Sequence, residues 1–172
     1  MKYRLLIVIV FIISVSVSAQ VPESYKAEMQ RMLGTWIADN SNYMSEQETD
    51  DAYAIRWTYG LDNTTLIGHL FGMKDGVKTS VYWQFFQFWD PENKQVRVIQ
   101  MNTYGTKGEG LVKYIDEQHS QLTQVYVNPD GSRFETGHKT ELYANKEISR
   151  SYEIKDGKWI EGRHYIWIKQ KE

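Results

Sequence analysis

Residues 33–40 read LGTWIADN, and this stretch marks the change from a helical pattern to a series of strands. The segment before it, 22–33, has apolar side chains at helical spacing and begins with Pro22, which suits a first helical position. Gly34 permits a close backbone turn where the helical pattern ends. An indole follows at Trp36 and offers a large apolar surface for burial, so we expect this stretch to close one end of a β-fold.

Strand-like segments with turn residues between them make up the rest of the chain. The predicted strands are Thr35–Asn40, Ala52–Tyr59, Thr65–Met73, Lys78–Trp89, Gln95–Asn102, Gly108–Ile115, Gln121–Val127, Ser132–Leu142, Ile148–Ile154 and Lys158–Lys169. Their short connections are rich in Gly, Asp, Asn and Pro, which favours hairpins between sequential strands. A long meander tends to close and so remove its edges. The sequence therefore predicts an all-β protein, an antiparallel up-and-down β-barrel of about ten strands with a short N-terminal helix.

The first 19 residues have the features of a secretory signal peptide. Lys2 and Arg4 precede a short apolar run that ends in small residues, and we expect cleavage after Ala19. The alternative is a membrane anchor, although the run is short against the roughly 20 apolar residues of a spanning helix. We therefore predict an exported protein, periplasmic or secreted, without a stable membrane anchor.

The remaining segment, 20–172, has the length of one domain and can bury a core without covalent links. The chain contains no cysteine, which excludes disulfides and a lipid-modified cysteine. Loss of the leader leaves 18 basic against 22 acidic side chains, so no basic surface suggests a nucleic-acid partner.

The Gly34-x-Trp36 pattern on the first strand, behind a short helix, resembles the lipocalin-like (calycin) barrels. The resemblance implies that Trp36 lies at the closed end of the barrel and that an Arg from a late strand packs across it. Arg163 is the first candidate for that role and Arg150 the second. The alternative interpretation is an ordinary core tryptophan after a helix-ending glycine.

Ten strands resemble two particular types of calycin. Fatty-acid-binding proteins clamp a carboxylate with an inward Arg-x-Tyr pair, and the last two predicted strands contain Arg163-x-Tyr165 and Arg150-x-Tyr152. The alternative for both pairs is a position on the outer face. Nitrobindin-type barrels bind haem through a His of the last strand, where this chain has His164. His164 alternates with Arg163 and Tyr165, so the clamp and the haem hypotheses exclude each other on that strand.

The resemblance implies a small apolar or amphipathic ligand inside the barrel, bound without catalysis and without a cofactor. Strand parity is open at this point, so some of the candidates belong to an outer face. The candidate ligand-binding residues are Trp57, Tyr59, His69, Phe71, Trp83, Phe85, Tyr126, Tyr152 and Tyr165, with Arg163 or Arg150 as polar anchor.

Two further functions stay open. A barrel hydrolase or isomerase would use His69 or His138 with a carboxylate such as Glu109 or Glu135. No nucleophile elbow and no metalloprotease helix motif accompanies them. The third hypothesis is a protein-interaction barrel or homodimer without a ligand, because several strands are apolar on both faces.

Overall fold

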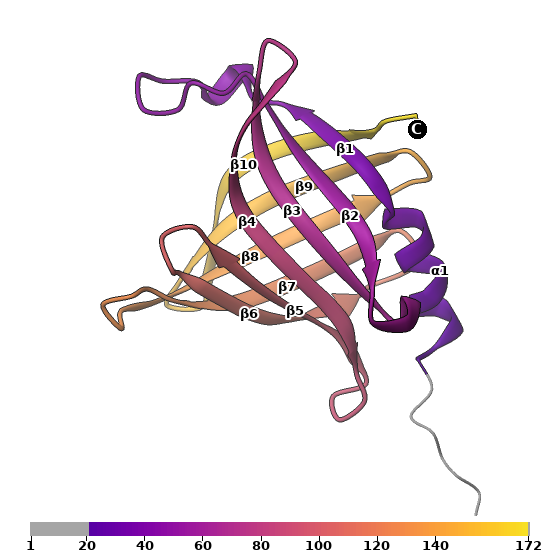
Figure 1. Ribbon diagram of the computed structural model, residues 1–172. Coiled ribbons are helices and arrows are strands. Elements are labelled where there is room, and N and C mark those ends of the chain that lie inside the picture. The colour runs from indigo at the N-terminus through magenta and orange to yellow at the C-terminus, as the bar shows by residue number, and fades with distance from the viewer. Residues whose placement is uncertain (1–20, 172) are drawn as a thin grey trace, which may run out of the picture.

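The computed structural model describes residues 21–171, and the predicted signal peptide lies outside the described residues. Within them, one α-helix precedes ten strands (Figure 1). The elements are α1 (Glu23–Met32), β1 (Gly34–Asp39), β2 (Ala52–Gly60), β3 (Thr65–Lys74), β4 (Val77–Asp90), β5 (Gln95–Asn102), β6 (Lys107–Tyr114), β7 (His119–Val127), β8 (Arg133–Leu142), β9 (Lys146–Lys155) and β10 (Lys158–Lys169), with short 3-10 helices at Ser41–Tyr43 and Leu61–Asn63. None of the helices in this range has the length and apolar character needed to cross a membrane.

The ten strands form a closed antiparallel barrel in chain order, and the first strand pairs with the last. In that closing pair Ile37 of β1 lies opposite Ile168 of β10, and Ala38 lies opposite Trp167. Closure leaves no strand at an edge of the sheet. The predicted fold class is confirmed, and the predicted strand bounds lie within two residues of the observed ones.

The barrel has two different ends (Figure 1). The helix end is crossed by α1. The Arg31 side chain donates to the carbonyl oxygen of Glu117 at 3.5 Å, and the Arg31 carbonyl oxygen accepts from Lys169 Nζ at 2.8 Å. The loop end includes the segment 40–51 between β1 and β2, together with the β3–β4 turn. One end is therefore crossed by a helix and the other is bordered by a long loop.

The stretch around Gly34 links α1 to the barrel. The amide of Leu33 closes the helix on the carbonyl of Met29 at 3.1 Å, and Gly34 then adopts φ +100°, a region that favours glycine. The Trp36 side chain is 2% exposed, and its Nε1 donates to the carbonyl oxygen of Met32 at 2.7 Å. The indole thus fixes the last turn of the helix against the first strand.

The cation over Trp36 is Lys169, with Nζ 5.4 Å from the ring centroid, and the expectation that Arg163 packs there is wrong. Lys169 lies six positions beyond Arg163 along β10, which is roughly 20 Å of strand. Arg163 therefore lies toward the loop end, where it pairs with Glu48. The second candidate, Arg150, pairs with Glu141 at 2.8 Å on the outer face.

The buried core is concentrated toward the helix end. One cluster joins α1 to the inner faces of β3, β5 and β6 through Tyr25, Met29, Leu66, Val96, Val98 and Val112. A second cluster comprises Trp36, Ala38, Leu142 and Trp167. The open volume inside the barrel runs alongside these side chains, from α1 and the β6–β7 turn toward the loop end.

Candidate functional site

The barrel encloses a cavity of about 380 Å³. That volume falls in the range of small-molecule sites, which are mainly apolar with a few polar groups. In a ring of ten strands, β8 lies opposite β3 and β9 lies opposite β4. The chemistry of the lining differs between these two sides.

One side of the cavity is apolar and aromatic. The residues of this apolar wall come from β2, β3 and β4: Ile55, Trp57, Leu70, Trp83 and Phe85. The rings of Trp57 and Phe85 lie 5.6 Å apart. Trp57 also lies flat over Gly68, where a Cβ would be 2.6 Å from its Cζ3 atom. A glycine on the neighbouring strand therefore makes the space that this indole occupies.

The facing side is polar. The residues of this polar wall come from β8 and β9: His138, Thr140, Glu147, Ser149 and Ser151. The strand register pairs His138 with Ser151 and Thr140 with Ser149, so the wall is a continuous polar strip. A ligand between the two walls would contact aromatic rings on one side and polar groups on the other.

A hydrogen-bonded group on β5 and β7 borders both walls. Gln100 Nε2 donates to Gln124 Oε1 at 3.1 Å and also contacts the Tyr126 hydroxyl. Gln124 is 1% exposed, and its Nε2 has no partner among the described residues. Burial raises the pKa of Tyr126 to about 12, so its hydroxyl stays protonated at neutral pH. A buried donor without an acceptor is costly, which makes Gln124 a group that a bound molecule can satisfy.

Four acidic residues line the cavity, Glu28, Asp116, Glu117 and Glu147, and burial affects the carboxyl groups of Glu28 and Glu147. Burial raises the pKa of Glu147 to about 7, and the charge of Glu28 on α1 raises it further. Burial also raises the pKa of Glu28, against the effects of the Tyr114 hydroxyl and of Arg31. Both carboxyl groups are therefore easier to protonate than in water.

The ring of His138 faces the cavity from the polar wall. Burial alone lowers its pKa to about 4, so the imidazole is neutral at physiological pH. No side chain of residues 21–171 forms a hydrogen bond with that ring. Across residues 21–171, no group of three His, Cys, Asp or Glu side chains lies together in a way that suits a metal ion.

A second hollow, of about 330 Å³, adjoins the cavity at the loop end. It shares Leu70, Trp83, Arg163, Tyr165 and Trp167 with the cavity and adds Tyr53, Tyr82, Asn102 and Tyr104. Its aromatic rings and its position at the loop end make it the vestibule of the site.

Arg163 reaches the vestibule because of a β-bulge in β10. The register with β9 shifts between Glu161 and His164, which reverses the alternation of inward and outward side chains. Ser151 stabilises the bulge: its Oγ accepts from the Arg163 amide at 2.9 Å and donates to the Arg163 carbonyl at 3.2 Å. The Arg163 guanidinium then donates to Glu48 and, at 3.2 Å, to the Tyr165 hydroxyl. This contact with Arg163 lowers the pKa of Glu48 to about 2.

The structure brings together about half of the residues predicted to bind a ligand. Six of them line the cavity: Trp57, Trp83, Phe85, Tyr126, Arg163 and Tyr165. Tyr59 follows Trp57 at the end of β2, is 38% exposed and does not line the cavity.

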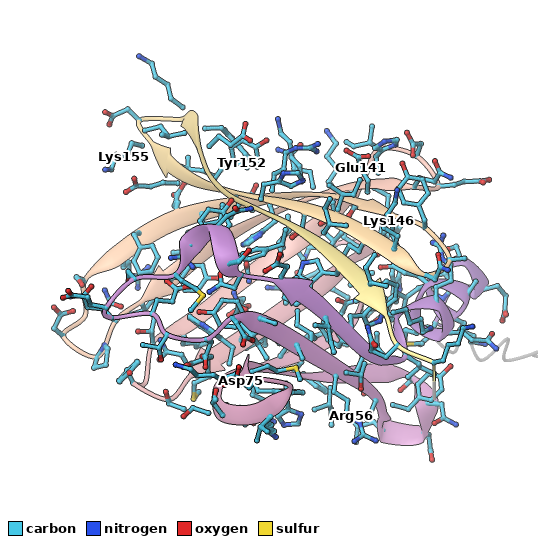
Figure 2. The ribbon with its side chains drawn as sticks, turned by 90° about the horizontal axis from the view of Figure 1, so that it is seen from above. Arg56, Asp75, Glu141, Lys146, Tyr152 and Lys155 are labelled. Atoms are coloured by element: carbon cyan, nitrogen blue, oxygen red, sulfur yellow. The ribbon has the colours of Figure 1, made fainter. Side chains whose placement is uncertain are left out.

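The other predicted side chains lie on the outer face. Phe71 packs under Lys78 Nζ at 4.6 Å, and Tyr152 packs against Trp159, with 5.3 Å between ring centroids. Arg150, like Tyr152, belongs to the outward set of β9, and Figure 2 labels Tyr152 and Glu141 on the outer side of the wall. His69 pairs in register with Arg56 and Gln84, whose side chains point outward. His164 also points outward, so a haem bound through it does not fit the interior.

The sequence interpretation did not include Glu147, Gln100, Gln124, Thr140 or the two serines of the polar wall. Polar residues at alternate positions of a strand usually face water, so the alternation alone does not single these residues out. The signal that points to them is the reversed pattern of β9, where Ile148, Arg150 and Tyr152 alternate with Glu147, Ser149 and Ser151. A strand with apolar or amphipathic side chains outside and small polar ones inside is typical of a barrel with a hydrated or ligand-filled interior.

Fold and site together define a closed ten-stranded antiparallel β-barrel with an interior cavity, an architecture compatible with the calycin barrels. No protein-family model and no curated protein sequence matches the chain.

Proposed function

We propose that this chain is an exported, lipocalin-like protein that binds a small, mainly apolar molecule inside the barrel and catalyses no reaction. The observation that carries the proposal is the 380 Å³ cavity with its aromatic wall. Apolar surface removed from water contributes roughly 25 cal/mol per Å², and the rings of Trp57, Trp83 and Phe85 offer that surface without any rearrangement of the fold. The pattern of residues 1–19 supports export, and the Gly34-x-Trp36 pattern supports membership of the calycin superfamily.

A neutral fluorescent probe, N-phenyl-1-naphthylamine, tests this proposal. We expect saturable binding with one probe per chain, accompanied by a change in tryptophan emission. The variant Leu70→Trp fills the cavity and should abolish the binding. The matched control Phe71→Trp changes the next residue, on the outer face, and should leave the binding intact. Absence of saturable binding, or equal binding by both variants, contradicts a ligand-binding interior.

An acid–base enzyme is less well supported by the positions of its candidate groups. His138 faces the cavity, but the carboxylates predicted to assist it do not: Glu109 pairs with Arg97, and Glu135 lies on the outer face. Glu147 is on the same wall as His138. Ser151 lies opposite His138 in register, and Glu147 is four positions from Ser151 along β9, or about 13 Å of strand. That separation is too long for direct proton transfer.

A dimer through the outer face is a second candidate. Ile166 and Ile168 are 49% and 47% exposed, and they lie beside Ile148 and Ile37 in register, so an apolar strip crosses β9, β10 and β1. Analytical ultracentrifugation of the wild type and of Ile166→Lys tests this candidate. A dimer that the lysine dissociates supports it, and a monomeric wild type contradicts it.

A further inference from the structure

The acidic group of the polar wall, Glu147, indicates what kind of molecule the cavity takes. We propose that the ligand is an organic cation, an amine with an apolar body, and that Glu147 is the counter-ion of its ammonium group. This inference rests on the proposed function and specifies the ligand of the same site.

The charges that line the cavity are unevenly balanced. Glu28, Asp116, Glu117 and Glu147 contribute four carboxyl groups to the lining, and of these Asp116 contacts His119 Nδ1 at 2.8 Å. The guanidinium of Arg163 is already occupied by Glu48, and Arg31 lies exposed at the rim on α1. Glu147 has no basic side chain within ion-pairing distance in the described part of the chain. The interior therefore has an unbalanced negative charge when Glu147 is ionised.

The surroundings of Glu147 make that charge costly without a ligand. Its neighbours in register are Leu142 and Trp167, both buried members of the core. An ionised carboxylate in such a place loses hydration, and only a partner charge or several donors restore the lost energy. An ammonium group inside the cavity supplies both, because it carries a charge and three N–H donors.

The opposite wall suits the remainder of such a molecule. Trp57, Trp83 and Phe85 present ring faces and edges to the cavity. Aromatic rings bind an apolar body and also attract a cation through their quadrupoles. The unpartnered Nε2 of Gln124 is an independent indication of a ligand: it needs an acceptor, such as a hydroxyl or carbonyl oxygen of the same molecule.

An anionic ligand meets a less favourable site. The basic group that would bind an anion is the Arg163 guanidinium. Trp167 lies opposite Glu147 in register, and Arg163 is four residues from Trp167 along β10, or about 13 Å of strand. A carboxylate bound there must first displace Glu48, whose two oxygens both contact the guanidinium. A cation bound at Glu147 displaces no protein group.

Three ligands of one chain length separate these cases: octylamine, octan-1-ol and octanoate, each competing against N-phenyl-1-naphthylamine. We expect octylamine to bind at least about tenfold more tightly than the other two, the difference that a single partly screened ion pair provides. Glu147→Gln should weaken octylamine by about tenfold and leave octan-1-ol within about twofold. Glu135→Gln, on the outer face of β8, is the matched control and should change neither.

The Glu147→Gln variant keeps the shape of the side chain and removes a buried charge, so we expect it to fold at least as well as the wild type. A second variant, Glu28→Gln, should weaken the binding of octylamine by a smaller factor.

Equal competition by the three ligands overturns the inference and leaves a cavity for apolar ligands in place. Tightest binding by octanoate, lost in Arg163→Met, overturns it in favour of a carboxylate clamp. Failure of the fluorescent probe to bind the wild type contradicts the proposed function itself.

Discussion

The carboxylate of Glu48 accepts two hydrogen bonds from the guanidinium of Arg163, Nη1 to Oε1 and Nη2 to Oε2, each at 2.5 Å. The two residues are 115 positions apart in the chain. Glu48 Oε1 also accepts from Asn40 Nδ2 at 3.1 Å and from the Tyr53 hydroxyl at 2.7 Å. One carboxylate thus joins the long loop 40–51 to β2 and β10 at the border of the vestibule.

We predict that Glu48→Gln loosens this loop without unfolding the barrel. The side chain of Arg163 is 43% exposed, so solvent screening limits the loss of unfolding free energy to about 1 kcal/mol at neutral pH. The pKa of Glu48 is lowered to about 2 in the folded protein. The ion pair therefore stabilises the fold above pH 4.5, the ordinary pKa of the group, and its contribution disappears as the pH falls through about 2.

Amide hydrogen exchange of residues 40–51 measures this effect directly. Exchange should accelerate in Glu48→Gln and stay unchanged in Glu46→Gln, an exposed glutamate of the same loop. Exchange in Glu48→Gln as slow as in the wild type would show that other contacts hold the loop.

A second prediction concerns the buried carboxyl of Glu147. Its pKa is raised to about 7 from an ordinary 4.5, so the folded protein binds the proton more tightly than the unfolded chain does. The associated stability is fully present below pH 4.5 and is lost as the pH rises through about 7. We expect the Glu147→Gln barrel to exceed the wild type by about 2–3 kcal/mol above pH 7 and to match it near pH 4. Urea unfolding at several pH values gives the comparison; equal curves at pH 8 would contradict an ionised, uncompensated Glu147.

The fold was predictable from the sequence because it depends on local signals. Turn residues between the apolar segments fixed the strand bounds, and Pro22 and Gly34 marked the two ends of the helical segment. Short connections imply antiparallel pairing of neighbours, and the pairing of β1 with β10 follows once a long meander closes.

The lining of the cavity was only partly predictable, because bulges in β4 and β10 change the alternation within a strand. In β4, the register against β3 shifts between Leu70 and Phe71, so Val81 faces outward while Trp83 faces inward. In β10, the shift after Glu161 turns Arg163 inward. A strict period of two carries no information about where an extra residue is inserted. The regular strand β9 has no such shift, and Arg150 and Tyr152 consequently stay outside.

A third prediction uses the glycine beneath Trp57. A methyl group at Gly68 would lie 2.6 Å from the indole, so Gly68→Ala forces the ring away from its position on the apolar wall. We expect a loss of about 1–3 kcal/mol of unfolding free energy, a change in near-UV circular dichroism and weaker binding of the fluorescent probe. Thr58→Ala, an exposed position on the outer face of β2, serves as the control. Unchanged probe affinity in Gly68→Ala would mean that Trp57 does not shape the site.

The fourth prediction follows from His138, whose effect on stability has the opposite sign from that of Glu147. Burial lowers its pKa from 6.5 to about 4, so its contribution is present above pH 6.5 and is lost as the pH falls through about 4. Between pH 4.5 and 6.5 the effects of the two residues on the free energy of unfolding have opposite pH dependence, and the wild type should show little net pH dependence from this pair.

His138→Gln should therefore lose stability as the pH rises through that window, and Glu147→Gln should gain it, each by about 2–3 kcal/mol. The double variant should lose both slopes. Unfolding free energies measured across this window test the pair, and single variants with slopes of the same sign would contradict the burial of one of the two side chains.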